Sequence, residues 1–396
     1  MIYLLIVLYL IFLIYIYDYK GLEKKRILYY KITVLILVLL AGLRYRIGSD
    51  TLAYEISFNA IPTIGKLTWR YVSEVSDYEI GFTVLVSLVK TIFGHFWCFL
   101  IIQSFVINYF ICGFFRKNTK NIFTAILIYF VVLYYFVNCE AARQGIALAI
   151  LLNSWPCFIN GKMKKMCTII IIASLFHISA IIFLILPILK ICKLWDKLRP
   201  NIVSGIIIVS IIIANYFIQQ FVSQTLLEYM VDGDIGGRVN FYYNDAHELS
   251  GISILTQLIY VVFYIIIPFC CLKKLKGRYC NYNNLASIVI LCSFFNVASG
   301  IPMVYRLTYY FIPFYFIMVS ESLFTTTNSN VIESKRKHIN ILILSFLSLF
   351  FFYKMQHYFY EDGSSSKLKY YMRFYPYNSV IEKGIDINRE EIYRGI

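Results

Sequence analysis

Apolar residues run through this chain in long blocks, and short polar stretches separate the blocks. A helix that crosses the hydrocarbon core of a bilayer needs about 20 mostly apolar residues, with a range of roughly 17–25. The blocks show no alternation of apolar and polar positions, which argues against strands of a transmembrane barrel and leaves helices. The pattern therefore predicts an all-α polytopic integral membrane protein.

By this length criterion we expect about 12 transmembrane helices, in a single membrane domain over residues 1–396. The blocks cover residues 2–17, 27–43, 79–93, 95–115, 121–137, 141–159, 166–189, 202–222, 251–272, 284–300, 306–324 and 339–354. The first block has neither a basic start nor a small-residue cleavage site, and a second block follows at once. We therefore expect a retained helix rather than a signal peptide.

Charge is scarce and mostly basic. The chain is 60% hydrophobic and 15% charged, with a net charge of +15, whereas a soluble domain has about a quarter of its residues charged. The excess of Lys and Arg lies in short loops, which favours the positive-inside effect over nucleic-acid binding. These basic loops, expected on the cytoplasmic side, are residues 20–26, 116–120, 161–165, 273–278 and 334–338.

Two pairs of basic loops conflict with the count of helices. Three apolar blocks lie between residues 26 and 116, and one lies between residues 165 and 190, although both ends of each interval are basic. Either a loop is basic on the outside or a segment is re-entrant. The best re-entrant candidate is residues 168–190, which His177 and Ser179 interrupt.

Three longer polar regions remain, at residues 44–78, 223–250 and 355–396. We expect the first two to be the larger extracytoplasmic loops and the third to be a polar C-terminal tail. The chain shows no internal repeat, whereas many transporters are built from related halves. That observation disfavours a transporter.

The first polar region opens with a charged cluster. Arg44, Arg46 and Asp50 follow an apolar block, and Gly48 permits a tight turn that would let both signs face one pocket. Arginine offers a planar fork that suits phosphate oxygens. The alternative is an interfacial cluster in which the arginines extend to the membrane surface.

A second cluster begins an apolar helix, where Glu140, Arg143 and Gln144 precede a run of small and apolar residues. Arg143 would point a fixed cation into the bundle, where an anionic ligand could be held. The alternative is a simple i, i+3 pair of Glu140 with Arg143 along one helix face.

Two further ionisable groups interrupt apolar blocks. His177, beside Ser179, is a candidate base, or else a histidine satisfied by a neighbouring carbonyl. Arg306 lies among tyrosines of an expected interfacial belt and is either another cation for the same pocket or an arginine at the membrane surface. Asp232 and Asp234 lack further ligands nearby, so we expect no metal site.

Four motifs occur in order, and together they resemble the Wzy-type O-antigen polymerases of the EpsG-like family. They are "LRYRIGSDTLAY", "NCEAARQGIALAI", "ASLFHISAIIFLILP" and "YRLTYYF", and the segment "FYPYNSVIE" at 374–382 resembles the proline–tyrosine segment near the C-terminus of that family. Each motif alone is a weak signal, whereas the ordered set is more specific.

The resemblance implies an enzyme with a helical fold related to lipid-dependent, GT-C-like glycosyltransferases. It would join oligosaccharide repeat units carried on undecaprenyl diphosphate at the periplasmic face of the bacterial inner membrane. The growing chain would leave its lipid diphosphate for a hydroxyl of the next unit. No metal or other cofactor would be needed, and a flippase and a chain-length regulator would be partners.

We infer residue roles from the positions that match these motifs and from the polar loop at residues 223–250. Arg143 and Arg306 would clamp the diphosphate, with Gln144 beside them and Arg44 as a further cation. His177 or Asp50 would orient or deprotonate the acceptor hydroxyl. Tyr54, Tyr242 and Tyr243 would hold sugar rings. A lipid-linked oligosaccharide flippase, an O-antigen ligase and a membrane-bound O-acyltransferase are the alternatives.

Overall fold

The computed structural model describes residues 2–48, 50–195, 262–297 and 305–324, with short pieces at 344–345, 348–350, 352, 374 and 377–381. The chain divides into two compact units. The first comprises Met1–Pro187 with Phe351–Ile396, and the second comprises Ile188–Phe350. Each unit is described by itself below.

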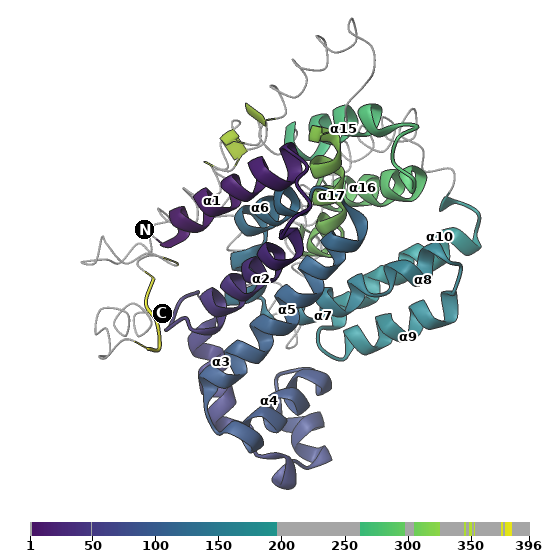
Figure 1. Ribbon diagram of the computed structural model, residues 1–396. Coiled ribbons are helices and arrows are strands. Elements are labelled where there is room, and N and C mark those ends of the chain that lie inside the picture. Colours follow the sequence, from purple (N-terminus) through teal and green to yellow (C-terminus); the bar gives the residue numbers. More distant parts are fainter. Residues whose placement is uncertain are drawn as a thin grey trace, which may run out of the picture. The chain divides into compact units, whose positions relative to one another are not determined.

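Five long helices form the bundle of the first unit (Figure 1). Helix α2 packs against α5, α5 packs against α7, and α1 packs against α6. Their apolar side chains supply most of the buried core, as expected of helices that are hydrophobic nearly all round. The five are α1 (Ile2–Leu13, continued by a π-helical turn Ile14–Tyr19), α2 (Arg26–Gly42), α5 (Phe96–Asn118), α6 (Ile122–Val132) and α7 (Ala142–Leu152).

A buried polar network fixes the chain just before α7, in the π-helical turn Phe136–Glu140. Asn138 lies at its centre and is fully buried. Its amide donates to the carbonyl of Tyr134 at 2.8 Å and accepts from Asn108 at 2.8 Å, while Gln103 donates to its backbone carbonyl at 2.9 Å. Buried amides are stable only when paired in this way, so the network sets where α7 begins.

Two of the basic loops meet at one end of this bundle. Arg26 donates to the backbone carbonyl of Lys120. Asp18, close by, accepts from the backbone N–H of Thr124 at 2.7 Å and from its hydroxyl at 2.8 Å, at the start of α6. The loops at residues 20–26 and 116–120 therefore lie on the same side, as their shared charge predicts.

The opposite end of the bundle carries a cap formed by residues 44–95, with α3 (Thr51–Ala60) and α4 (Ile80–Phe93). Lys90, near the end of α4, donates to the carbonyls of Asn59 and Ile61 at 2.7 Å each. Both ends of α4 thus lie in the cap, and between residues 26 and 116 the chain runs along the bundle through α2 and α5. This arrangement removes the first conflict between basic loops and helix count.

The second conflict disappears at His177. Helices α8 (Trp155–Ile159) and α9 (Met163–Ser174) precede it, and a 3-10 helix Ile178–Leu184 and α10 (Ile185–Ile191) follow it. The 3-10 helix packs back against α9 and also against α7, so the chain reverses at the histidine (Figure 1). The segment singled out as the re-entrant candidate, residues 168–190, folds back on itself at His177 as a helical hairpin.

The second unit is held by hydrogen bonds between its own helices. Tyr315 of α17 donates to the carbonyl of Phe263 at 2.6 Å, and Lys274 of α15 donates to the carbonyl of Ser322. Its described elements are a π-helical turn Val262–Ile266, α15 (Ile267–Leu275), α16 (Tyr282–Val297), a 3-10 helix Tyr305–Tyr310 and α17 (Ile312–Phe324). The expected blocks at 202–222 and most of 339–354 lie outside the described residues.

Among the described residues, two helices are long and apolar enough to cross a membrane, Ile2–Tyr19 and Phe96–Asn118. Helix α4 has 14 residues, about 21 Å at about 1.5 Å per residue, whereas a bilayer core is about 30 Å thick. The all-helical fold is confirmed. The expected total of about 12 transmembrane helices stays a prediction.

Candidate active site

The first residue that the sequence singles out on α7, Arg143, points into the cap. Its Nη1 lies 2.8 Å from Oε2 of Glu79. Its guanidinium lies 4.7 Å above the ring of Tyr78 and within hydrogen-bonding range of Tyr54. The side chain keeps 27% of its surface exposed and Glu79 keeps 20%. Arg143 is therefore held by the cap through Glu79 and is still partly open to a ligand.

Glu79 also holds the turn of the helical hairpin. Its Oε1 accepts from the backbone N–H of Ile178 at 3.2 Å. Two residues later, the N–H of Gly81 donates to the carbonyl of Leu175 at 2.8 Å, and a Cβ at Gly81 would lie only 2.8 Å from that oxygen. One carboxylate thus joins Arg143 to the turn that carries His177.

The ring of His177 is fixed in one tautomer by its neighbours. The backbone N–H of Ser179 donates to its Nδ1 at 3.3 Å, and the Ser179 hydroxyl lies 2.7 Å from the same nitrogen. Because a backbone N–H can only donate, Nδ1 is the unprotonated nitrogen and Nε2 carries the hydrogen. In this arrangement Nε2 of His177 is a donor and not a base.

Asp50 and Tyr54 lie one turn apart at the start of α3 in the cap. Asp50 is exposed, whereas Tyr54 is buried. Burial raises the pKa of Tyr54 to about 12, and the charge of Asp50 adds to that rise. The phenol is therefore protonated near neutral pH and can only serve as a neutral hydrogen-bonding group.

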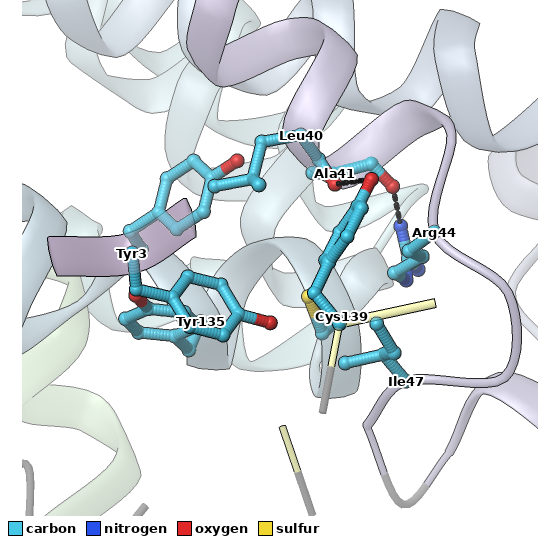
Figure 2. Close-up of a pocket in the computed structure, with 9 residues that line it drawn as sticks. Tyr3, Leu40, Ala41, Arg44, Ile47, Tyr135 and Cys139 are labelled. Carbon is cyan, nitrogen blue, oxygen red and sulfur yellow. Dashed lines mark hydrogen bonds between the residues drawn. The ribbon is translucent and has the colours of Figure 1, made fainter. Parts of the chain in front are cut away.

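Arg44 lies elsewhere in the first unit, in a small pocket of its own (Figure 2). It is only 1% exposed, and the pocket does not include Arg46 or Asp50. Arg46 instead pairs with Glu55 at 3.2 Å. This pocket therefore contains Arg44 alone of the three, since Arg44 turns under the end of α2, whereas Asp50 at the start of α3 is exposed.

The other predicted residues differ in burial and in the unit to which they belong. Gln144 is buried inside the bundle, 2% exposed. Arg306 is half-buried in the second unit, so its role in a shared clamp stays a prediction. Tyr242 and Tyr243 lie outside the described residues, as do Asp232 and Asp234. Across the described part of the chain, no three His, Cys, Asp or Glu side chains are grouped to hold a metal.

Two residues of this site are absent from the sequence-based set, Glu79 and Tyr78. Glu79 is the first residue of the apolar block at 79–93 and directly precedes α4, much as Glu140 stands close before α7. Treating every charge at the border of an apolar block as a candidate would have included it. Its link to Arg143 depends on the cap and has no signal in the sequence.

No curated protein and no solved structure matches this chain. The sequence model of the EpsG family matches residues 27–379, a stretch that includes all four motifs, the cap, the hairpin and residues 377–379 of the C-terminal segment. Together with the ordered motifs and the helical fold, this match places the chain in the EpsG family.

Proposed function

We propose that this protein is a polysaccharide polymerase that joins oligosaccharide repeat units carried on undecaprenyl diphosphate. Membership of the EpsG family supports a polymerase-like role in polysaccharide biosynthesis and an association with glycosyltransferase-like enzymes. The observation that carries the proposal is the position of Arg143, a half-open cation at the junction of bundle, cap and hairpin.

Arg143 is suited to a diphosphate leaving group. Its Nη1 is committed to Glu79, while its buried Nε has no hydrogen-bond partner among the described residues. Charge-assisted bonds from arginine to phosphate oxygens are strong and directional. Donors aimed at the position where charge develops stabilise the transition state more than the ground state. Arg143 would stabilise the diphosphate as its bond to the sugar breaks.

The transfer needs one bond formed and one broken. The acceptor hydroxyl oxygen attacks the anomeric carbon of the growing chain, the carbon–oxygen bond to the diphosphate breaks, and the hydroxyl proton passes to a base. Asp50 is the base we propose, since Glu79 is held by Arg143 and Ile178, and His177 presents Nε2–H. His177 would orient the acceptor as a donor.

The other assignments complete the proposal. Arg306 and Gln144 would add to the diphosphate clamp, and Tyr54, Tyr242 and Tyr243 would border the sugar. The cap would face the periplasm from the inner membrane, because it lies opposite the basic loops that the positive-inside rule places in the cytoplasm. A flippase would supply the lipid-linked units and a chain-length regulator would act on the product.

The test is the ladder of surface lipopolysaccharide from a strain that lacks the gene, complemented with wild-type chain, Arg143→Ala or Arg70→Ala. We expect single-repeat product without the gene, a full ladder with the wild type, and no ladder with Arg143→Ala at equal protein level. Arg70 is the matched control, because it belongs to the cap but is 83% exposed and pairs only with nearby Glu74.

The null strain also separates the rival functions. Core that bears no repeat at all would favour the flippase or the ligase, because both act before a repeat reaches the core. An unchanged ladder in the null strain would overturn the assignment, and a full ladder with Arg143→Ala would overturn the clamp.

A further inference from the structure

Arg44 is a fully buried cation whose binding edge has no partner. Its Nη1 donates to the carbonyl of Ala41, whereas Nε and Nη2 are buried without a hydrogen-bond partner among the described residues. Nε and Nη2 share one edge of the guanidinium, the edge that presents two parallel N–H bonds to a carboxylate or phosphate. An arginine buried with this edge empty is costly, which calls for a ligand.

The pocket around this side chain contains no acid. Aromatic and aliphatic side chains make up most of its wall, together with Cys139 (Figure 2). Cys139 does not supply the missing charge, because burial raises the pKa of its thiol to about 11. The pocket is lined by Tyr3, Leu40, Ala41, Arg44, Ile47, Tyr134, Tyr135, Cys139 and Tyr377.

The space left in the pocket is small. Its volume is about 10 Å³, about that of one water molecule. A phosphate group therefore enters only if part of the wall withdraws. The wall includes Tyr377, which comes from the far end of the sequence.

The C-terminal segment, residues 377–381, closes the pocket by pairing with the chain on either side of Arg44. The N–H of Tyr45 donates to the carbonyl of Asn378 at 2.8 Å, and the N–H of Val380 donates to the carbonyl of Leu43 at 2.9 Å. Tyr377 donates its hydroxyl to the carbonyl of Leu40 at 3.0 Å. Residues 377–381 form a short, partly exposed segment that is not part of any helix of the bundle.

We propose that Arg44 is a second anion site, with a fork that takes a phosphate group, and that residues 377–381 are a strap that closes this site in the structure. Withdrawal of Tyr377 opens the pocket, and the phosphate group fills the Nε/Nη2 edge. The phosphate belongs either to a lipid-linked diphosphate or to a free phosphate compound. The lipid source rests on the proposed function, whereas the pocket and its strap do not.

Cys139 reports on the pocket in the native chain. The full-length protein in lipid nanodiscs is treated with a small maleimide, and labelling of each cysteine is followed by peptide mass spectrometry. Cys139 is 4% exposed and should react slowly in the wild type. Tyr377→Ala should raise its labelling rate at least tenfold, whereas Tyr377→Phe should change it little, because the ring still fills the wall.

Cys112 is the internal control, since it is fully buried in α5 and does not line the pocket. Its labelling should stay unchanged in Tyr377→Ala. If Cys112 also reacts, the chain has loosened as a whole, and Val380→Pro then replaces Tyr377→Ala. That substitution removes the N–H that donates to Leu43 and leaves the ring of Tyr377 unchanged, and the same tenfold rise at Cys139 is expected. An unchanged rate at Cys139 in the folded variant would overturn the strap.

The ligand is tested with inorganic diphosphate on the opened variant. Diphosphate should slow labelling of Cys139 at least fivefold, and the added substitution Arg44→Lys should abolish this protection because an ammonium lacks the fork. Protection by undecaprenyl diphosphate in the nanodisc at concentrations where inorganic diphosphate has no effect would identify the lipid source. Equal protection would identify a free phosphate site. No protection by either would mean that the pocket holds water only.

Discussion

Glu79 is the residue on which the candidate site depends most, because it is the shared acceptor for Arg143 and for the N–H of Ile178. Glu79→Ala should lower the polymerisation rate at least tenfold, or about 1.4 kcal/mol, because both groups lose their position. Glu79→Gln keeps an acceptor for the N–H of Ile178 but loses the charge. Its polymerisation rate should lie between those of the wild type and Glu79→Ala. The measurement is the rate of chain growth in membranes that contain equal amounts of each variant.

Glu74→Ala provides the comparison for that series. Glu74 also pairs with an arginine of the cap, Arg70, but both side chains are more than half exposed. Exposed ion pairs contribute about 0–1 kcal/mol to stability. Glu74→Ala should therefore leave the polymerisation rate within about twofold of the wild type. Equal losses at Glu74 and Glu79 would mean that the cap is merely unstable and that Glu79 has no positioning role.

His177 allows the donor role to be separated from the base role. In His177→Gln, the side-chain amide can donate from the place of Nε2, whereas His177→Asn has an oxygen near the place of Nδ1 that can accept from Ser179. If Nε2 orients the acceptor, the Gln variant should retain at least tenfold more activity than the Asn variant. Equal, complete loss in both, with normal protein levels, would instead support a base.

The sequence pointed to single candidate residues, but it did not point to their partners. Arg143 and His177 could be found because a charge or an imidazole interrupts an apolar block, and such groups are costly unless they have a task. Their connection through Glu79 depends on α4 folding back into the cap, which no local pattern encodes. Arg44 was found for the same reason as Arg143, yet its pocket depends on residues more than 330 positions away, such as Tyr377.

At the scale of helices, close backbone approach defines the start of α7. A Cβ at Gly145 would lie against the carbonyl oxygen of Val137 and 2.8 Å from Cδ1 of Ile107. Gly145→Ala should destabilise the protein by about 1–3 kcal/mol, because it overpacks the junction of α5, α7 and the preceding turn. The measurement is a thermal unfolding midpoint, which should fall by several degrees.

Gly113→Ala is the matched change in α5. Nothing lies within 4 Å of a Cβ placed there, and alanine is favoured over glycine inside a helix by about 0.5–1 kcal/mol. The midpoint should rise or stay unchanged. A drop equal to that of Gly145→Ala would show that both helices simply resist substitution and that the approach at Gly145 has no special cost.

The boundaries of the helices agree closely with the apolar blocks. The blocks do not predict whether a helix runs along the bundle or folds back. The blocks at 27–43 and 95–115 became α2 and α5 nearly unchanged. The block at 79–93 became α4 and the block at 166–189 became a hairpin, because hydropathy measures burial and length but not where a helix points. The basic loops did point to these two segments, because each conflict between loop charge and helix count lies in an interval that contains one of them.

At the scale of the molecule, the fold of the first unit predicts that both ends of α4 face the same side of the membrane. Counting each apolar block as a crossing helix predicts that they face opposite sides. If α4 crossed the membrane, His95 would lie on the side opposite Trp69. In the structure both belong to the cap, and both are exposed. The loop at residues 161–165, by contrast, lies across α7 and α9 from the turn at His177, and its three lysines predict the cytoplasmic side.

Cysteines placed at 69, 95 and 162 test this prediction in intact cells. A membrane-impermeant maleimide should label Trp69→Cys and His95→Cys equally, and it should label Lys162→Cys only after the cells are opened. All three wild-type side chains are exposed and make no contact that holds the cap, so the fold should tolerate each change. Labelling of Trp69→Cys without His95→Cys would restore α4 as a crossing helix. It would also separate the two ends of α4, so that Glu79 and Lys90 could not both lie in the cap that holds Arg143.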